Sequence, residues 1–268
     1  MNIIEIESKE NKKIKELNKL KLKKYRQARG RFVVENWKII QDAFESGIFF
    51  EELFVTKDFL AKNKEALSTM LGQEQTVFVV TPNIEKSLSL LDSPQGIRAV
   101  YKKETKTLDL NKDVVYLNNI NDPGNLGTIL RSALAFGLEN IVLDEGCVDV
   151  YNSKTIQAAK DAIFKLNIVF DKGREVFEKI KENNFNIYVT NVEKGQSLEE
   201  IFGASQKRCI VLGNESRGVE AVLEKEATKL INIKTTSNIE SLNVAISAGI
   251  IFYESFKSLK EDGVNHDK

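Results

Sequence analysis

The chain has 268 residues, of which 42% are hydrophobic and 29% are charged, an ordinary balance for a globular protein. Basic and acidic residues both number 39, so the formal net charge is zero and gives no general argument for nucleic-acid binding. The single histidine, His266, lies in a polar C-terminal segment, which excludes histidine-based triads and histidine metal sites. Cys147 and Cys209 show no metal-ligand spacing, so no metal is expected.

Positive charge is concentrated near the N-terminus, where residues 1–40 hold twelve lysines and arginines against five glutamates. Such a segment can track phosphates, and it is equally compatible with a solvated amphipathic helix. The N-terminus lacks a signal-peptide layout, and no apolar run approaches the roughly 18–20 residues of a membrane span. With cysteines suited to a reducing compartment, these features predict a cytoplasmic protein without a membrane partner.

Hydrophobic periodicity predicts a compact α/β unit in the first part of the chain. The expected helices cover residues 8–24, 37–47, 58–71 and 84–91, and the expected strands cover 31–35, 53–55, 76–80 and 97–101. We expect residues 1–103 to form one domain. The polar and charged segment 104–112 is then a linker to the next domain.

A second alternation of strands and helices follows the linker. Continuous Val, Ile and Leu runs predict strands at 114–117, 141–143, 168–170, 187–189, 210–212 and 230–233, with helices near 126–136, 153–164, 173–183 and 241–259. Such strands are typical of a mostly parallel sheet covered by helices on both faces. The last helix carries a second apolar row, Ile246, Ile250 and Tyr253, which favours a core position or a subunit interface. We expect this domain to span 113–260, followed by a disordered tail at 261–268.

Three loops in the second domain follow predicted strands, where parallel sheets bind ligands. They are residues 118–127, 212–218 and 237–244. Taken singly, each is also compatible with an ordinary capped helix start or strand-to-helix turn.

Particular side chains in these loops suit a site. Asn125 and Ser241 are candidate helix caps. Glu215 is placed to hold a ligand or to orient Arg131, and Asn243 needs a hydrogen-bond partner wherever it is buried.

Together, the three loops resemble the motifs of the SpoU family of RNA ribose methyltransferases, within the wider SPOUT class. The first motif reads NNINDPGNLGTILRSALAFG, the second reads IVLGNESRG, and the third reads INIKTTSNIESLNVAISAG. They occur in the family's order, and the resemblance covers residues 114–256.

The resemblance implies a function: methyl transfer from S-adenosylmethionine to a ribose 2′-hydroxyl of structured RNA, with ribosomal RNA favoured over transfer RNA. It implies a SPOUT fold, with a parallel sheet and a deep trefoil knot, acting as a homodimer. The implied cofactor contacts are Leu212, Gly213, Ile233, Ser241 and Leu242. The implied catalytic residues are Asn125, Arg131, Glu215, Ser241 and Asn243, with Arg131 acting either as a base or as a stabiliser of phosphate and alkoxide charge.

The first part of the chain resembles the RNA substrate-binding domain that precedes some SpoU catalytic domains, which has the α/β fold of certain ribosomal proteins. The resemblance rests on NKKIKELNKLKLKKYRQARGRFVVEN and DSPQGIRAV. It implies RNA contacts from Lys23, Lys24, Arg26, Arg29 and Arg31. Asn36 departs from the family's usual glycine, but asparagine tolerates left-handed backbone geometry better than most residues.

Three alternatives remain open at this point. A non-catalytic RNA-binding protein would have no need of the complete motif set. An ordinary Rossmann enzyme is permitted by the α/β alternation, although neither its glycine fingerprint nor a P-loop is present. Base methylation within the SPOUT class is disfavoured by the SLNV pattern. The sequence leaves open which RNA and nucleotide are modified, whether the modification is housekeeping or confers antibiotic resistance, and whether naked RNA or an assembly intermediate is the substrate.

Overall fold

The computed structural model describes residues 2–71, 75–198, 207–236 and 238–261. By its contacts the chain divides into two compact units: Met1–Glu104 with Tyr151–Gln157, and Thr105–Val150 with Ala158–Lys268. The segment Tyr151–Gln157 therefore packs with the first unit, although it lies in the second part of the sequence. From residue 262 onward, the tail expected at 261–268 lies outside the described residues. Within those ranges, no helix is both long and apolar enough to cross a membrane.

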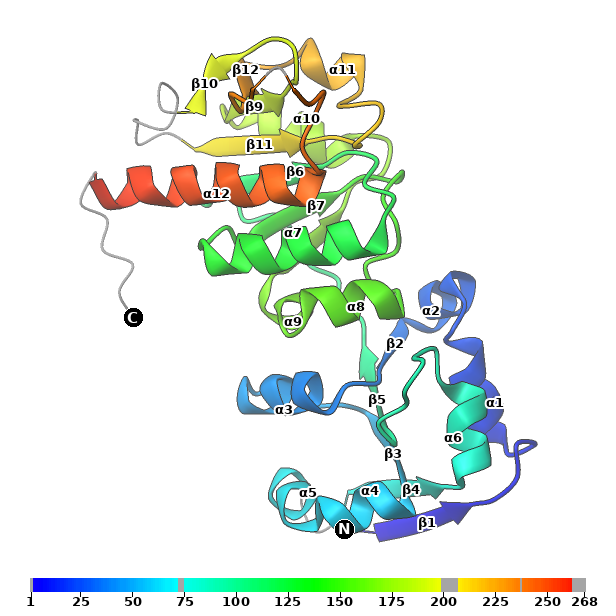
Figure 1. The fold of residues 1–268 in the computed structure, drawn as a ribbon. Helices are drawn as coiled ribbons and strands as arrows, with labels where there is room; N and C mark the ends of the chain where they lie inside the picture. Colours follow the sequence, from blue (N-terminus) through cyan, green and yellow to red (C-terminus); the bar gives the residue numbers. More distant parts are fainter. Residues whose placement is uncertain (1, 72–74, 199–206, 237, 262–268) are drawn as a thin grey trace. The chain divides into compact units, whose positions relative to one another are not determined.

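The first unit is a five-stranded sheet in the order β1-β4-β3-β5-β2, with helices on both of its faces (Figure 1). β1, β4 and β3 are parallel, whereas β5 runs antiparallel to both β3 and β2. One hydrophobic cluster joins the apolar side of the first helix to the sheet, through Ile14, Leu17 and Phe54. The strands are β1 (Asn2–Ile6), β2 (Arg31–Val34), β3 (Glu52–Thr56), β4 (Thr76–Val80) and β5 (Ile97–Lys102), and the helices are α1 (Lys12–Lys19), α2 (Lys23–Arg29), α3 (Trp37–Glu45), α4 (Lys57–Lys62), α5 (Lys64–Met70) and α6 (Pro82–Leu88).

Three details of this unit differ from the sequence prediction. The helix expected at 8–24 is shorter, ending at Lys19 as α1, and the separate helix α2, which runs to Arg29, was not expected; the helix expected at 58–71 is divided into α4 and α5. β1 was not expected, because only Ile6 of this edge strand is buried and it shows no alternating pattern. Asn36 is extended, with φ −118°, and its side chain caps α3 by accepting from the Ile39 N–H at 3.1 Å. It needs no left-handed geometry, so the reason given for tolerating it was wrong.

A charged cluster lies inside the first unit. Arg98 is only 1% exposed, and its Nη2 donates to Glu35 at 3.2 Å and to Glu85 at 3.1 Å. The Ser89 hydroxyl donates to the same Glu35 oxygen at 2.7 Å. Burial raises the pKa of Glu85, and the charge of Arg98 opposes that rise. Two buried carboxyls therefore depend on a single guanidinium.

We predict that Arg98→Met lowers the free energy of unfolding of this unit by about 3–5 kcal/mol, because both glutamates lose their buried partner. Trp37 is the only tryptophan of the chain, so its fluorescence during denaturant unfolding reports on this unit. Lys62→Met, at an exposed helical position of the same unit, is the control and should change stability little. A loss below about 1 kcal/mol in Arg98→Met would show that the cluster does not depend on the guanidinium.

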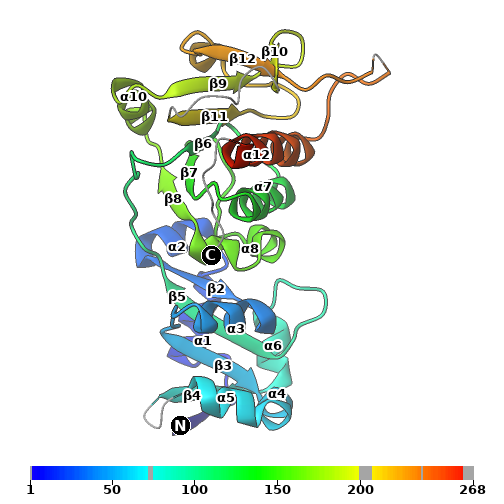
Figure 2. The same ribbon diagram turned by 90° about the vertical axis from the view of Figure 1, so that its left-hand side faces the viewer.

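The second unit is a seven-stranded parallel sheet in the order β10-β12-β9-β11-β6-β7-β8. α10 lies on one side of the sheet, and α7 and α12 lie side by side on the other (Figure 2). The predicted parallel α/β architecture is confirmed. The strands are β6 (Val114–Leu117), β7 (Asn140–Leu143), β8 (Asn167–Phe170), β9 (Asn186–Thr190), β10 (Gln196–Ser197), β11 (Arg208–Leu212) and β12 (Lys229–Asn232), and the helices are α7 (Pro123–Ala135), α9 (Ala162–Lys165), α10 (Glu175–Glu182), α11 (Ala221–Glu224) and α12 (Val244–Glu261). Most of α8 (Ser153–Ala159) lies in the segment Tyr151–Gln157 that belongs to the first unit.

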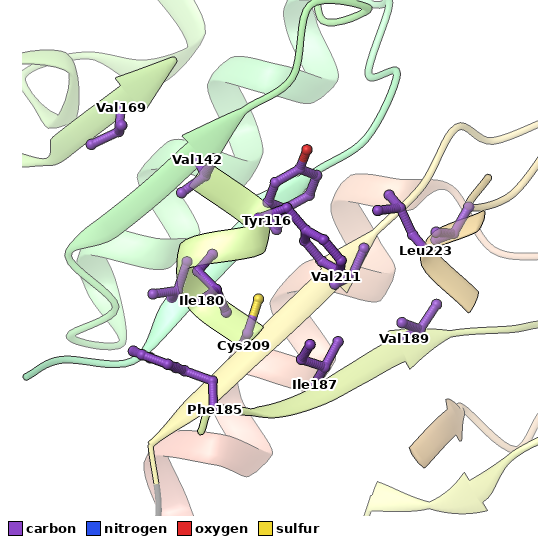
Figure 3. Packing of buried hydrophobic residues seen from close by; sticks show 13 residues of the cluster. Tyr116, Val142, Val169, Ile180, Phe185, Ile187, Val189, Cys209, Val211 and Leu223 are labelled. Atoms are coloured by element: carbon purple, nitrogen blue, oxygen red, sulfur yellow. The ribbon is translucent and has the colours of Figure 1, made fainter. Parts of the chain in front are cut away.

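The core of this unit explains why its strands read as continuous apolar runs. The side chains of Tyr116 of β6 and Val211 of β11 lie on the face of the sheet that α10 covers. They and Ile180 of α10 are fully buried (Figure 3). The ring of Phe177 meets that of Tyr116 edge-on at a centroid distance of 5.2 Å. Neighbouring strand residues face the opposite helical layer, so both faces of the central strands are apolar. The predicted motif loops are thus connected to a rigid sheet.

Candidate functional site

The three motif loops leave the sheet at the same edge, because β6, β11 and β12 are parallel strands of one sheet. β6 and β11 are direct neighbours, and β9 lies between β11 and β12. The segment after β12 runs out from the sheet before it returns to the start of α12 (Figure 2). Loops that are far apart in sequence can therefore meet beyond the carboxyl ends of the strands, where parallel sheets bind ligands.

Glu215 joins the three loops through one carboxylate oxygen. Its Oε1 accepts from the side-chain amide of Asn125 at 2.7 Å and from that of Asn243 at 2.5 Å. The Asn243 amide also donates to Asn125 Oδ1 at 3.1 Å, which closes a triangle of three side chains. The backbone N–H of Val244 points to the same Glu215 oxygen at 3.4 Å. Three of the five predicted catalytic residues therefore form one network, each from a different motif.

The helix caps at the site are not the predicted ones. Asp122, not Asn125, caps α7: its carboxylate accepts from the Asn125 N–H at 2.8 Å. α12 begins at Val244, and Asn243 caps it by accepting from the N–H groups of Ala245 and Ile246. The prediction of Ser241 as the cap was wrong. Both errors have the same cause, because several capping residue types stand close together in these loops.

A second set of hydrogen bonds, called the clasp below, joins the first motif to the second and was not predicted from the sequence. Asn118 Oδ1 accepts from the Glu220 N–H at 2.9 Å, and the Asn119 amide donates to Glu220 Oε1 at 2.7 Å. The Asn214 amide donates to the Asn119 carbonyl at 3.0 Å. Asp144 accepts from the Asn118 amide at 2.6 Å and from the Asn119 N–H at 3.1 Å. Its position directly after β7, at the same sheet edge, was a usable signal in the sequence, whereas Glu220 gave none.

Two residues of the clasp depend on local backbone geometry. Asn119 has φ 56°, in the left-handed region that asparagine enters more readily than most residues. The side chain of Asn119 occupies the space beside Gly146, where a Cβ would lie 1.8 Å from Asn119 Oδ1. Gly146 is thus required for the clasp as it stands.

The second motif forms a tight backbone turn. Asn214 and Gly218 exchange both backbone hydrogen bonds, at 3.0 and 2.8 Å. A Cβ on Gly213 would lie 2.3 Å from the carbonyl carbon of Gly218. Only glycine allows this approach, and the turn that it permits presents Glu215 to the other two loops.

Arg131 is not held by Glu215, contrary to the expectation that Glu215 orients it. It is exposed, and among the described residues it has no hydrogen-bond or ion-pair partner. It follows Asn125 by six positions on α7, so the two residues point about 120° apart around the helix axis. The guanidinium is therefore free to meet a ligand.

The predicted cofactor residues lie at the carboxyl ends of β11 and β12. Leu212 and Gly213 are buried, Ile233 and Leu242 are half-buried, and Ser241 is exposed. Ser241 makes no hydrogen bond within the described part of the chain, so the structure does not bring it into the Glu215 network. Among all residues that the structure describes, no group of three or more acidic, cysteine or histidine side chains could hold a metal ion.

The predicted RNA-binding residues differ in exposure. Lys23 and Lys24 are exposed. Arg29 pairs with Glu16 at 3.2 Å, and Arg31 pairs with Glu51. The prediction that Arg26 contacts RNA is corrected by the structure. Its side chain is only 5% exposed, and its Nη1 donates to the carbonyls of Leu20 and Lys21. It holds the turn between α1 and α2, which removes it from an RNA-facing surface.

Comparison with known protein families shows to which family the chain belongs. Residues 112–253, more than half of the chain, match the model of the SpoU rRNA Methylase family. The chain belongs to this family. Residues 11–99 match the MRM3-like substrate binding domain, so the SpoU region follows a second recognised domain.

Two relatives align with nearly all of this chain. The 23S rRNA (guanosine(2553)-2′-O)-methyltransferase RlmP of Bacillus subtilis (strain 168) is 28% identical over 249 residues, covering 93% of this chain and 98% of that protein. The mitochondrial rRNA methyltransferase 3 of Xenopus laevis is 28% identical over 306 residues, covering 90% of this chain and 72% of that protein. Both alignments include the SpoU region and most of the first unit.

Solved structures resemble the whole chain as well. The crystal structure of an RNA 2′-O ribose methyltransferase has 28% identity and a TM-score of 0.78, covering 95% of this chain and 99% of that one. An AdoMet-bound rRNA methyltransferase from Sinorhizobium meliloti has a TM-score of 0.84 at 24% identity, covering 96% of this chain and 98% of that one, which shows the fold. The folds of these solved structures thus match nearly the full length of this chain, including the part that precedes the SpoU region.

We predict that Gly213→Ala destabilises the second unit by about 1–3 kcal/mol or more, because the added methyl overlaps the Gly218 backbone. Thermal unfolding followed by circular dichroism measures the change. Gly249→Ala is the matched control, since a Cβ at that α12 position meets nothing within 4 Å and alanine favours a helix. Equal melting temperatures for the two variants would contradict the packing argument.

Proposed function

We propose that this chain transfers a methyl group from S-adenosylmethionine to a ribose 2′-hydroxyl of structured ribosomal RNA. The observation that carries the proposal is the Glu215 network, which joins one side chain from each SpoU motif at the carboxyl edge of the sheet. The similarity to a 23S rRNA 2′-O-methyltransferase and to an RNA 2′-O ribose methyltransferase supports the reaction, and the first of these relatives supports the substrate class. A protein that only binds RNA has no need for this convergence of polar groups.

The residues at the ends of β11 and β12 suit an adenosine-containing cofactor. Leu212, Ile233 and Leu242 offer apolar side chains for a flat base, while the tight turn after Gly213 leaves backbone polar groups near the same edge. We assign the cofactor contacts to these residues together with Ser241. When bound there, S-adenosylmethionine supplies an electrophilic methyl group on a sulfonium.

Arg131 acts on charge in this proposal. A guanidinium stays protonated in proteins, which argues against its use as a base. Its exposed position, with no partner in the described part of the chain, suits a phosphate next to the target ribose and the negative charge that develops on the 2′-oxygen as its proton leaves. The Glu215 network holds Asn125 in the first turn of α7, the helix from which Arg131 projects. Correct positioning of the reacting groups can itself supply roughly 7–11 kcal/mol of the barrier.

The first unit holds the RNA in this proposal. Its match to a substrate binding domain supports that role, as does the basic segment that carries Lys23 and Lys24. A fold like that of ribosomal RNA-binding proteins and domain limits at 1–103 and 113–260 remain predictions, as does the cytoplasmic location. Structured RNA is read mainly by shape, unpaired loops and the 2′-hydroxyl, so a separate binding domain suits this substrate.

The first test is methyl transfer from labelled S-adenosylmethionine to unmodified ribosomal RNA and, separately, to transfer RNA, followed by nucleoside analysis. We expect a 2′-O-methylated nucleoside from ribosomal RNA. Arg131→Ala should lower transfer by about 100- to 1,000-fold while cofactor affinity, measured by calorimetry, stays unchanged. Lost cofactor affinity in this variant would contradict the assigned role.

Glu215 allows a graded comparison within the same assay. Glu215→Ala removes the shared acceptor, whereas Glu215→Gln keeps a carbonyl oxygen that can accept from Asn125 and Asn243. Transfer should therefore fall further in the alanine variant. Equal losses would indicate that the negative charge of Glu215, and not its hydrogen bonds, is what the reaction requires.

We further propose a homodimer and a deep trefoil knot across the second and third motifs. The family resemblance supports both. The sheet order, in which β9 lies between the later strands β11 and β12, is compatible with a threaded chain. An exposed apolar row on α12 supports the homodimer, and it consists of Ile246, Ile250 and Tyr253.

We predict that Ile246→Glu/Ile250→Glu converts the dimer to monomers, because charges placed in an apolar interface lack partners. Sedimentation velocity measures the mass. Lys179→Glu places the same side chain at an exposed position of α10, on the opposite side of the sheet from α12, and should leave the dimer intact. A dimer that survives the double substitution would place the interface elsewhere.

A further inference from the structure

A groove on the first unit has a cavity volume of about 370 Å³ and is separate from the three motif loops. Its floor is apolar and consists of Leu17 of α1, Leu20 at the end of that helix and Val100 of β5, all of which are buried. Pockets of this size suit a small organic group with a flat apolar face. The floor therefore favours an occupant that is more than a simple ion.

The rim of the groove carries charge of both signs, with four basic and two acidic side chains. Lys13 and Arg31 share Glu52, at 3.0 and 3.5 Å. Arg29 pairs with Glu16 at 3.2 Å, whereas Lys12 has no ion-pair partner among the described residues. The rim therefore keeps a net positive charge, and its Lys12–Arg29 side is best suited to receive an anion.

We propose that this groove receives an unpaired nucleotide of the RNA substrate, with the base over the apolar floor and the phosphate beside Lys12 and Arg29. The inference rests on the proposed RNA-binding role of the first unit. Base and phosphate together match the two kinds of surface in the groove. Bases of single strands also stack on arginine guanidinium planes, and two arginines line the rim.

The acidic side chains fit the same occupant. Nucleobase edges carry N–H donors, and the Glu16 and Glu52 carboxylates can accept from them. A continuous duplex offers phosphates on its outside but keeps its bases stacked and paired, so it leaves the apolar floor unused. The groove therefore distinguishes unpaired from paired RNA, which the exposed Lys23 and Lys24 alone would not do.

The test measures binding of the full chain to a fluorescein-labelled single-stranded RNA of roughly ten nucleotides, by anisotropy at several salt concentrations. Lys12→Gln/Arg29→Gln removes two charges from the rim without touching the floor. We expect weaker binding and a salt slope smaller by about 0.7, since the two side chains contact one phosphate and each phosphate contact in a single strand contributes about 0.7. A duplex of the same length should compete poorly with the single strand.

Lys62→Gln/Lys64→Gln is the matched control, because it removes two exposed charges of the same unit away from the groove. Equal loss of affinity in both double variants, or equal competition by the duplex, would overturn the proposal. The assay needs no methyl transfer. Groove-dependent binding without any methyl transfer to ribosomal RNA would contradict the proposed reaction but not the groove. Methyl transfer with an unchanged KM for RNA in the Lys12→Gln/Arg29→Gln variant would contradict the role of the groove but not the reaction.

Discussion

The shared acceptor at Glu215 Oε1 is the interaction on which the geometry of the site depends. Two side-chain amides, from Asn125 and Asn243, meet the same carboxylate oxygen, and each belongs to a different motif loop. Hydrogen bonds to a charged acceptor are the stronger kind, at about 1.5–3 kcal/mol, but these are open to water. Such bonds can select one arrangement among several, yet they cannot hold three loops against the sheet. The loops must already be close before Glu215 joins them.

The clasp between Asn118, Asn119 and Glu220 supplies that proximity. Asn118 and Asn119 follow β6 directly, and their partner Glu220 lies on the segment after β11, the neighbour of β6 in the sheet, so little freedom remains between β6 and the first-motif loop. Asn119 is kept in a left-handed conformation that costs a non-glycine residue free energy. Surrounding contacts, including the Asp144 carboxylate, offset that cost. The site thus consists of a rigid clasp near the strands and a lighter, solvent-open network further out.

The sequence was sufficient for the strands and the motif order, because both depend on local patterns. Continuous apolar runs mark buried parallel strands whatever lies around them, whereas β1 escaped notice because it is an exposed edge. Caps were harder: Asp122 and Asn125 are both capping types in the same turn, and only the backbone path decides between them. Arg26 looked like part of a basic surface, but it folds back onto the carbonyls of Leu20 and Lys21. Charge composition does not reveal which cation is turned inward.

Arg131 is the opposite case: the sequence suggested that it pairs with Glu215, but the structure leaves its guanidinium exposed. Had Glu215 paired with it, as the sequence suggested, the ion pair would have been close to neutral and the guanidinium would have had to leave a carboxylate before meeting an anion. Because Glu215 accepts from two uncharged amides instead, the positive charge of Arg131 is not offset within the described part of the chain. An unpaired cation does not have to leave a carboxylate before it meets negative charge that develops nearby, so its whole charge can contribute to electrostatic stabilisation. The use of neutral partners for Glu215 is therefore part of what keeps Arg131 available for the proposed reaction.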